Sequence, residues 1–293
     1  MTPGLYDLPR SAYDAADGVN FSTLKYFARS AAHYRHALLQ PHEDTDALAL
    51  GRAVHLAVFE PEKFRSRVVR WDGGTRRGRE WEAFRSEFRE RDILRDADYQ
   101  LCLDLAGAAR ADATAGRYLS GGRPEVTMFW EHERPSAGAL PGWSMRCRGR
   151  VDFLSTEGAI CDLKTTRDSS PIAFGRQAAS LGYHVLAAWY VDGHEAATGK
   201  RLPFVVVAIE KAPPFAVAVY EVPEELLALG RETYRGWLSQ LRVCREESRW
   251  PGYGDGPMQL QLPRWAMPGE DDSADDLGLG FTTDKESTDG AEF

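Results

Sequence analysis

Residues 147–166 read Cys-Arg-Gly-Arg-Val-Asp-Phe-Leu-Ser-Thr-Glu-Gly-Ala-Ile-Cys-Asp-Leu-Lys-Thr-Thr, and they decide the predicted fold. Two short apolar runs, 151–154 and 159–163, flank a turn that ends in glycine, which predicts a β-hairpin. Side chains two apart on a strand share a face, so Asp162 and Lys164 should point the same way. Closing the hairpin brings Asp152 across to them. We therefore expect two carboxylates and one ammonium group at the end of a mostly apolar sheet.

This cluster has two interpretations. Mg²⁺ prefers carboxylate oxygens and retains waters or substrate phosphates as further ligands, and Lys164 could then orient a nucleophile and offset negative charge. The alternative is a buried salt bridge without a catalytic role. The composition favours the first interpretation, because only six of the 36 basic residues are lysines and one of them lies inside an apolar strand. An unpaired ammonium group is costly there, whereas a compact point charge is useful in catalysis.

The amino-acid composition of the 293-residue chain, with 43% hydrophobic and 27% charged residues, is that of an ordinary soluble globular protein. No apolar run approaches 18 residues, and the N-terminus lacks the basic-then-apolar pattern of a signal peptide, so we expect a cytoplasmic protein without membrane attachment. The four cysteines have no close spacing, which favours free thiols over a zinc site, a disulfide framework or an iron–sulfur cluster.

The net charge of −8 is localised. Residues 269–293 contain nine acidic residues and one lysine, a balance that equals the net charge of the whole chain, so the remaining body can carry a basic face. Residues 63–95 contain ten arginines with interleaved tryptophan and phenylalanine. We expect the loop 73–78 to contact phosphates, and the helix from about residue 80, where glutamates balance the arginines, to be simply solvated.

The order of predicted elements indicates an α+β (mixed α/β) fold, with a central mixed sheet flanked by helices and a helical N-terminal part. Residues 1–20 are expected to be an irregular lead-in, and residues 249–293 a Pro/Gly-rich and then acidic, disordered tail. The predicted helices are 20–40, 46–59, from about 80, 98–119, 171–180, 182–192 and 223–247. The predicted strands are 125–131, 143–154, 159–165, 204–210 and 216–221, of which the first three form an antiparallel meander.

Several separated motifs share one known pattern. They are Gly51-Arg52-Ala53-Val54-His55, the Glu125-containing strand 124–130, Arg150-Val151-Asp152, Asp162-Leu163-Lys164-Thr165-Thr166, the loop 76–81 and the N-terminal stretches 20–25 and 31–34. In order and spacing the set resembles the PD-(D/E)XK nuclease superfamily, and within it the RecE-like (exodeoxyribonuclease VIII-like) phage and prophage exonucleases. The resemblance implies a restriction-endonuclease-like core and a single nuclease domain over residues 21–248.

The resemblance also implies roles for the site residues. His55, which by itself would more often be a core histidine, becomes a metal ligand with Asp152, Asp162 and the Leu163 carbonyl, holding one or two Mg²⁺ or Mn²⁺ ions. Lys164 would position the attacking water, and Glu125 would hold a second metal's water or orient Lys164. The residues expected to contact DNA are Arg52, Arg76, Arg77, Arg79, Tyr183 and Tyr190.

One position departs from the family pattern, because Leu186 stands where the family has a glutamine in its Gln-x-x-x-Tyr motif. Gln177 lies about two helical turns earlier and is not expected to replace it. The leading interpretation is still an exonuclease on linear double-stranded DNA ends in phage-type recombination. Family likeness adds a ring-shaped homo-oligomer and a single-strand-annealing recombinase as partner. The alternatives are an endonuclease or Cas4-like nuclease, the latter disfavoured by the lack of clustered cysteines, and a catalytically weak DNA-binding or assembly module.

Overall fold

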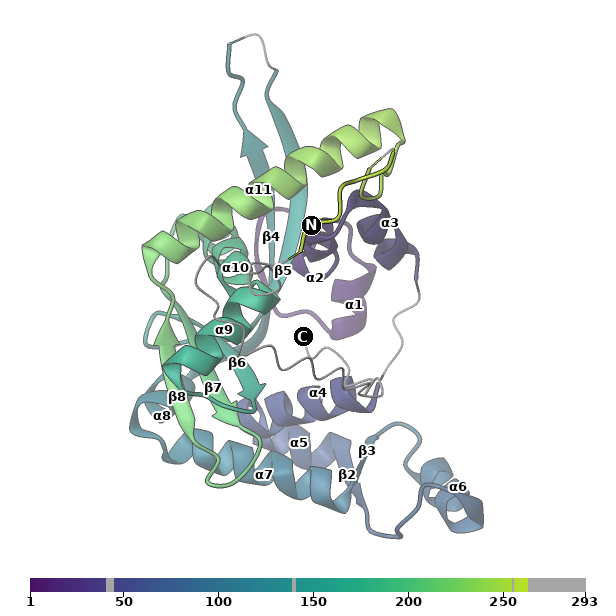
Figure 1. The fold of residues 1–293 in the computed structure, drawn as a ribbon. Coiled ribbons are helices and arrows are strands. Elements are labelled where there is room, and N and C mark those ends of the chain that lie inside the picture. Colours follow the sequence, from purple (N-terminus) through teal and green to yellow (C-terminus); the bar gives the residue numbers. More distant parts are fainter. Residues whose placement is uncertain (41–44, 139–140, 255, 263–293) are drawn as a thin grey trace, which may run out of the picture.

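A six-stranded sheet runs through the centre of the computed structural model, which describes residues 1–40, 45–138, 141–254 and 256–262 (Figure 1). In spatial order its strands are β1 (Gly4–Tyr6), β4 (Gly122–Arg134), β5 (Trp143–Ser155), β6 (Ile160–Thr166), β7 (Phe204–Glu210) and β8 (Val217–Glu221). Neighbouring strands are antiparallel except β6 and β7, which are parallel. The predicted mixed sheet is confirmed.

The predicted hairpin is formed by β5 and β6. Its turn closes with a hydrogen bond from the Ser155 amide to the Ala159 carbonyl, and Gly158 adopts φ +77°, a conformation that side-chain-bearing residues rarely take. β4 pairs with β5 along its length, which completes the predicted antiparallel meander. The two acidic positions of the hairpin are thus brought to neighbouring strands.

Helices cover both faces of the sheet (Figure 1). They are α4 (Asp46–Phe59), α7 (Asp96–Ala111), α8 (Ala113–Leu119), α9 (Pro171–Leu181), α10 (Tyr183–Thr198) and α11 (Glu224–Glu247). β7 shows why two layers are needed, because Phe204, Val206 and Ala208 pack in the core with α10 and α11, whereas Val207 and Ile209 pack with α4 and α7. A strand that is apolar at every position before its final glutamate must be buried on both sides.

Close packing of α10 on α11 depends on Gly230. A Cβ atom at this position would lie 2.9 Å from the Val185 Cα atom and closer still to the His184 carbonyl, both of them backbone groups. The two helix axes can approach this far only because Gly230 has no side chain.

We expect Gly230→Ala to lower the free energy of unfolding by about 3 kcal/mol, the upper part of the range for overpacked sites, because the backbone of α10 must move. Gly236→Ala on the same helix is the matched control. A Cβ atom there meets nothing within 4 Å, so alanine should stabilise the helix by up to about 1 kcal/mol. Urea unfolding of the two variants measures both effects, and equal stabilities would contradict the packing argument.

The N-terminal helix predicted for residues 20–40 is divided into three segments, a correction with a local cause. They are α2 (Phe21–Leu24), the 3₁₀ helix η1 (Lys25–Ala28) and α3 (Ala31–Leu39). Asn20 caps α2 as the sequence predicts, but Ser30 accepts a hydrogen bond from the His33 amide and starts a new helix. Residues 1–20, expected to be irregular, contain β1 and a further helix, α1 (Arg10–Ala15).

The helix predicted for 98–119 is divided in the same way, into α7 and α8. The Asp112 carboxylate accepts hydrogen bonds from the amides of Thr114 and Ala115, so it caps α8 and ends α7. The sequence analysis also missed a parallel pair of short strands, β2 (Val68–Trp71) and β3 (Asp92–Arg95). Together with α5 (Pro61–Arg67) and α6 (Gly78–Glu87) these strands belong to the arginine-rich part of the chain.

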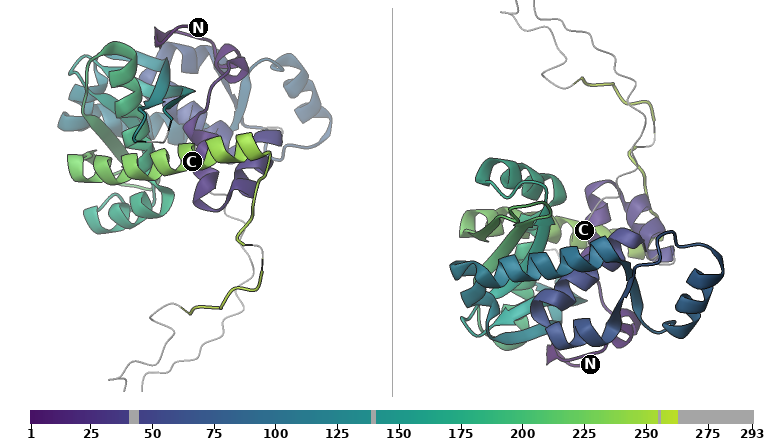
Figure 2. Two further views of the ribbon diagram at one scale, coloured as in Figure 1. Left: turned by 90° about the horizontal axis from the view of Figure 1, so that it is seen from above. Right: turned by 90° about the horizontal axis from the view of Figure 1, so that it is seen from below.

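We use the name arginine-rich projection for residues 68–95, whose α6 stands away from the rest of the molecule in both views of Figure 2.

At the other end of the chain, the Trp250 ring stacks on Tyr34 and the Pro251 carbonyl accepts a hydrogen bond from the Ala32 amide. The chain just beyond α11 therefore packs against α3, while residues 263–293 of the predicted tail lie outside the described residues. Within the described ranges, no helix combines the length and apolar character needed to cross a bilayer.

Candidate metal centre and active site

The site begins where β5 and β6 separate. Their paired residues are Phe153 with Cys161 and Leu154 with Ile160, and the ladder does not continue to the next pair. Instead, the Asp152 carboxylate accepts a hydrogen bond from the Leu163 amide at 3.0 Å. The side chain thus replaces a backbone partner, and the separation of the strands leaves room for other groups.

Three possible metal ligands meet at this point. One ligand atom each from His55, Glu125 and Asp152 lies within 4.8 Å of the others, and His55 Nδ1 is 3.7 Å from an Asp152 carboxylate oxygen. They come from α4, β4 and β5, and Glu125 lies opposite Asp152 because the flanking pairs of the ladder are Pro124 with Phe153 and Val126 with Val151. A set of one imidazole and two carboxylates fits a divalent cation such as Mg²⁺ or Mn²⁺.

Glu125 is held in an unusual backbone conformation. Its φ of +55° lies in the left-handed region, which a non-glycine residue rarely adopts inside a strand. The Arg150 guanidinium forms an ion pair with its carboxylate and also donates to the Leu8 carbonyl at 2.7 Å. Such conformations concentrate at functional sites, where surrounding contacts maintain them. Arg150 is therefore the ion-pair partner of the Glu125 carboxylate at the site.

Asp162 and Lys164 form the second half of the site. Lys164 Nζ lies 2.8 Å from Asp162 Oδ2, and the two side chains are 15% and 5% exposed. Besides this ion pair, the buried oxygen has no hydrogen-bond partner among the described residues. A buried carboxylate oxygen with spare acceptor capacity is what a cation would require. Asp162 is outside the group of three ligand atoms, so its role as a ligand, like that of the Leu163 carbonyl, stays a prediction.

Burial and the neighbouring negative charges have opposite effects on the pKa of Lys164. Burial alone would lower the pKa of its ammonium group, but the carboxylates of Asp162 and Asp152 outweigh burial and raise the pKa above its ordinary value. Lys164 is therefore a permanent positive charge at neutral pH and cannot act as a general base. It can stabilise negative charge and donate hydrogen bonds.

Burial raises the pKa of Asp152 to about 6, with the positive charge of His55 opposing the rise and the negative charge of Asp162 adding to it. The ordinary pKa of an aspartate is about 4. In the absence of a cation, three clustered carboxyl groups repel one another, so a bound cation and a proton compete for this site.

We expect Mn²⁺ binding to weaken as the pH falls through about 6, by about tenfold per pH unit, because Asp152 must lose its proton before it can bind the ion. Above that pH the carboxylate is already ionised and the affinity should level off. Calorimetric titration with Mn²⁺ at several pH values, in buffers of different ionisation enthalpy, measures both the affinity and the protons released. An affinity that stays constant below pH 6 would contradict a carboxylate ligand with this raised pKa.

Residues 20–258 match the family described as "PDDEXK-like domain of unknown function (DUF3799)". The chain belongs to this family. Asp162-Leu163-Lys164 has the acid-x-lysine form of the PDDEXK name. This membership indicates a hydrolase of the nuclease type with DNA as its substrate. No curated protein matches the chain.

Among solved structures, the chain is similar to the crystal structure of a protein from Eubacterium rectale that is described as a candidate exonuclease. The match has a TM-score of 0.57 and 16% identity, and it covers 88% of this chain and 96% of the other. It supports the restriction-endonuclease-like fold. A match to the protein SSO0001 has 14% identity, covers 73% and 83% of the two chains, and has a TM-score of 0.26, too low to indicate a common fold.

Of the two tyrosines predicted to contact DNA, Tyr183 belongs to the main apolar core and Tyr190 packs against it. The Tyr183 ring centroid is 5.2 Å from Lys164 Nζ. Tyr190 lies over Gly149, where a Cβ atom would come within 2.9 Å of the ring. Burial, and then the charges of Tyr13, Asp152 and other acidic groups, raise the pKa of Tyr190. Both rings are thus next to the charged groups, and their contact with DNA stays a prediction.

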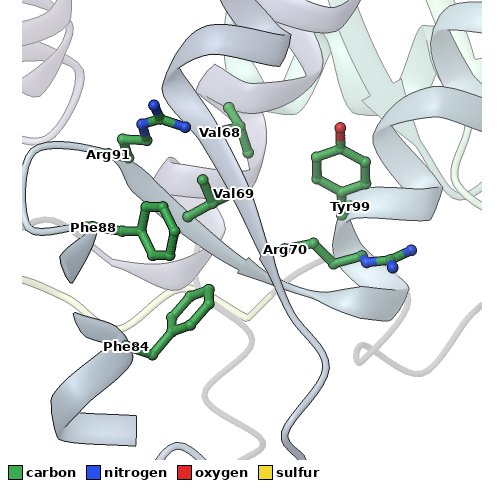
Figure 3. Close-up of a pocket in the computed structure, with 7 residues that line it drawn as sticks. All are labelled: Val68, Val69, Arg70, Phe84, Phe88, Arg91 and Tyr99. Carbon is green, nitrogen blue, oxygen red and sulfur yellow. The ribbon is translucent and has the colours of Figure 1, made fainter.

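The arginines predicted to contact DNA have different surroundings. Arg76 forms an ion pair with Asp46, donates to the Ile93 carbonyl and lies over the Trp81 ring, so it holds the projection against α4. Arg77 and Arg79 are exposed on the projection, and Arg52 is exposed on α4. A hollow at the base of the projection (Figure 3) is lined by Val68, Val69, Arg70, Phe84, Phe88, Arg91 and Tyr99. None of these positions is part of the metal group, and their DNA contacts stay predictions.

Two residues that the structure places at the site had no role in the sequence-based predictions. Arg150 was seen only as part of a motif, without its ion pair to Glu125. Burial, and then the positive charge of the nearby Lys164, lower the pKa of Lys25 to about 7. Gln177, which was not expected to replace the family glutamine, accepts a hydrogen bond from the Thr166 hydroxyl at the end of β6. The scarcity of lysine in the chain could have singled out Lys25 by the argument used for Lys164.

Proposed function

We propose that the protein is a metal-dependent exodeoxyribonuclease that hydrolyses linear double-stranded DNA from its ends. The observation that carries the proposal is the meeting of His55, Glu125 and Asp152 beside the Asp162–Lys164 pair, at the end of a PDDEXK-like core. His55, Glu125 and Asp152, joined by Asp162 and the Leu163 carbonyl, would hold Mg²⁺ or Mn²⁺. Such an ion supplies Lewis-acid polarisation of the phosphodiester and a more acidic water.

The protein's own groups have separate tasks in this proposal. Lys164, kept charged by the two aspartates, donates hydrogen bonds to the attacking water and to the phosphate as negative charge develops. Asp162 keeps the ammonium group directed into the site, at 2.8 Å. Arg150 fixes the Glu125 carboxylate, so that two carboxylates and one imidazole are arranged before substrate arrives. Phosphoryl transfer depends on such positioning more than on covalent help.

The same proposal includes the type of nuclease, the oligomeric state, a protein partner and a cellular role. The exonuclease assignment is supported by the fold shared with a protein described as a candidate exonuclease, and by exposed arginines on the projection that can contact phosphates. A ring-shaped homo-oligomer, a single-strand-annealing recombinase partner and a role in phage-type recombination in the cytoplasm follow from the resemblance noted in the sequence. Light scattering after gel filtration, with and without duplex DNA, tests the ring.

One assay separates the candidate functions. Linear and covalently closed circular duplexes are incubated with Mg²⁺, or with Mn²⁺, and the wild type is compared with Lys164→Ala. Degradation of the linear duplex alone, lost in the variant, supports the exonuclease. Cutting of the closed circle supports an endonuclease instead. DNA binding without cutting, by both proteins and with both ions, would replace the proposal with a binding or assembly module.

A further inference from the structure

A chain of polar contacts connects the end of β6 to the Lys164 ammonium group. The Thr166 hydroxyl donates to Gln177 Oε1 at 2.7 Å, and Gln177 Nε2 donates to the Tyr183 hydroxyl at 3.4 Å. The Tyr183 ring, in turn, lies against Lys164 Nζ at 5.2 Å from its centroid, within cation–π range. Gln177 therefore contacts two residues near Lys164. One is Thr166, two positions after Lys164 on β6, and the other is Tyr183 of α10, whose ring lies against the Lys164 ammonium group.

The path of the chain makes this contact possible. α9 ends at Leu181, and Gly182, with a φ of +70°, turns the chain directly into α10. Gln177 of α9 therefore reaches Tyr183, the first residue of α10. The amide is suited to the position because it accepts from one hydroxyl and donates to the other. Leu186, one turn further along α10, packs against the main apolar core. The apolar Leu186 side chain cannot donate a hydrogen bond, whereas Gln177 of α9 donates one to the Tyr183 hydroxyl.

We propose that Gln177 is a positioning residue which, through Tyr183, keeps the Lys164 ammonium group directed at the reacting phosphate. The proposal rests on the nuclease function proposed above. A lysine side chain has four rotatable bonds and loses conformational entropy when it is confined to one rotamer. Asp162 restrains the ammonium group on one side at 2.8 Å, and the Tyr183 ring restrains it on another. Gln177 fixes that ring.

A purely structural role is the competing explanation. Thr166 and Tyr183 are 2% and 8% exposed, and buried hydroxyl groups need hydrogen-bond partners whether or not the site is catalytic. In that case, loss of Gln177 would lower stability without a specific effect on Lys164. The two explanations differ in what happens to the lysine, and this difference can be measured directly.

The kinetic test uses Gln177→Met, which keeps the side-chain volume but removes both hydrogen bonds. With linear duplex and saturating Mg²⁺, we expect kcat to fall about tenfold and KM to stay within about twofold, as for loss of a group that acts only on the transition state. Tyr183→Phe, which keeps the ring, should have a similar effect. The double variant should be no slower than the slower single variant, because the two residues act in one chain. Gln240→Met, the same change at an exposed position of α11, is the control.

The spectroscopic test does not require activity. With only six lysines, ¹³C-labelled lysine gives a simple spectrum in which the ε-CH₂ signal of Lys164 is identified by its loss in Lys164→Met. The Tyr183 ring current should shift this signal, and Gln177→Met should move it while Gln240→Met does not. An unchanged Lys164 signal, or additive kinetic effects of the two variants, would overturn the positioning role. A moved signal in a protein that cuts no DNA would refute the nuclease proposal and still support the contact.

Discussion

Lys164→Ala is expected to lower kcat for cleavage of linear duplex DNA by at least about 100-fold, the typical cost of removing one preorganised electrostatic group. The ammonium group is buried beside Asp162 and is kept charged by two carboxylates, so no solvent cation can replace it easily. Binding of duplex in Ca²⁺, measured by fluorescence anisotropy, should change little. Lys200→Ala, an exposed lysine after α10, is the control and should keep full activity.

Lys164→Ala should also lower the stability of the fold, and the response of this loss to Mn²⁺ tests whether Asp162 is a metal ligand. Removal of the ammonium group leaves the buried Asp162 carboxylate without its ion pair, and breaking a buried pair costs about 3–5 kcal/mol. If Asp162 is a metal ligand as predicted, Mn²⁺ should restore part of the lost thermal stability. A Lys164→Ala protein that cleaves within threefold of the wild-type rate would exclude the proposed role of this lysine.

Asp152→Asn is expected to have the second large effect, a loss of about 1,000-fold or more in cleavage rate together with much weaker Mn²⁺ binding. Asp152 is central to the site, because it lies within reach of His55 and Glu125 and accepts the Leu163 amide. Neutralising it removes several kcal/mol of charge stabilisation at the ion. Calorimetric titration with Mn²⁺ and the duplex assay measure both effects. Glu225→Gln, an exposed carboxylate at the start of α11, is the control.

Two further variants compare the possible ligand sets. Glu125→Gln should weaken Mn²⁺ binding if the ion is held by the three grouped side chains, and Asp162→Asn should weaken it if the ion also reaches the Asp162 oxygen that has no hydrogen bond. Normal Mn²⁺ affinity in Asp152→Asn would contradict both sets, because this carboxylate is common to them.

Local patterns predicted much of the fold. Helix α4 and strand β7 have the predicted bounds, and the glycine-ended turn and alternation around Asp162 and Lys164 predicted the hairpin and its shared face. These features depend on residues close together in the chain, because the spacing of apolar side chains follows the period of the strand or helix. The same locality explains the errors, since Ser30 and Asp112 interrupt helices whose apolar periodicity continues across them.

By itself, then, the sequence determined the strands β4 to β8, the hairpin, the acid-x-lysine cluster and, through separated motifs, the nuclease superfamily. Only the tertiary structure decided that Glu125 would join His55 and Asp152, with its backbone in a left-handed conformation held by Arg150, and that Gln177 would reach Tyr183 beside Lys164. The reason is physical. Those contacts join different strands and helices, and they depend on strand register, helix packing and the burial of charge, none of which leaves a periodic signal in neighbouring residues.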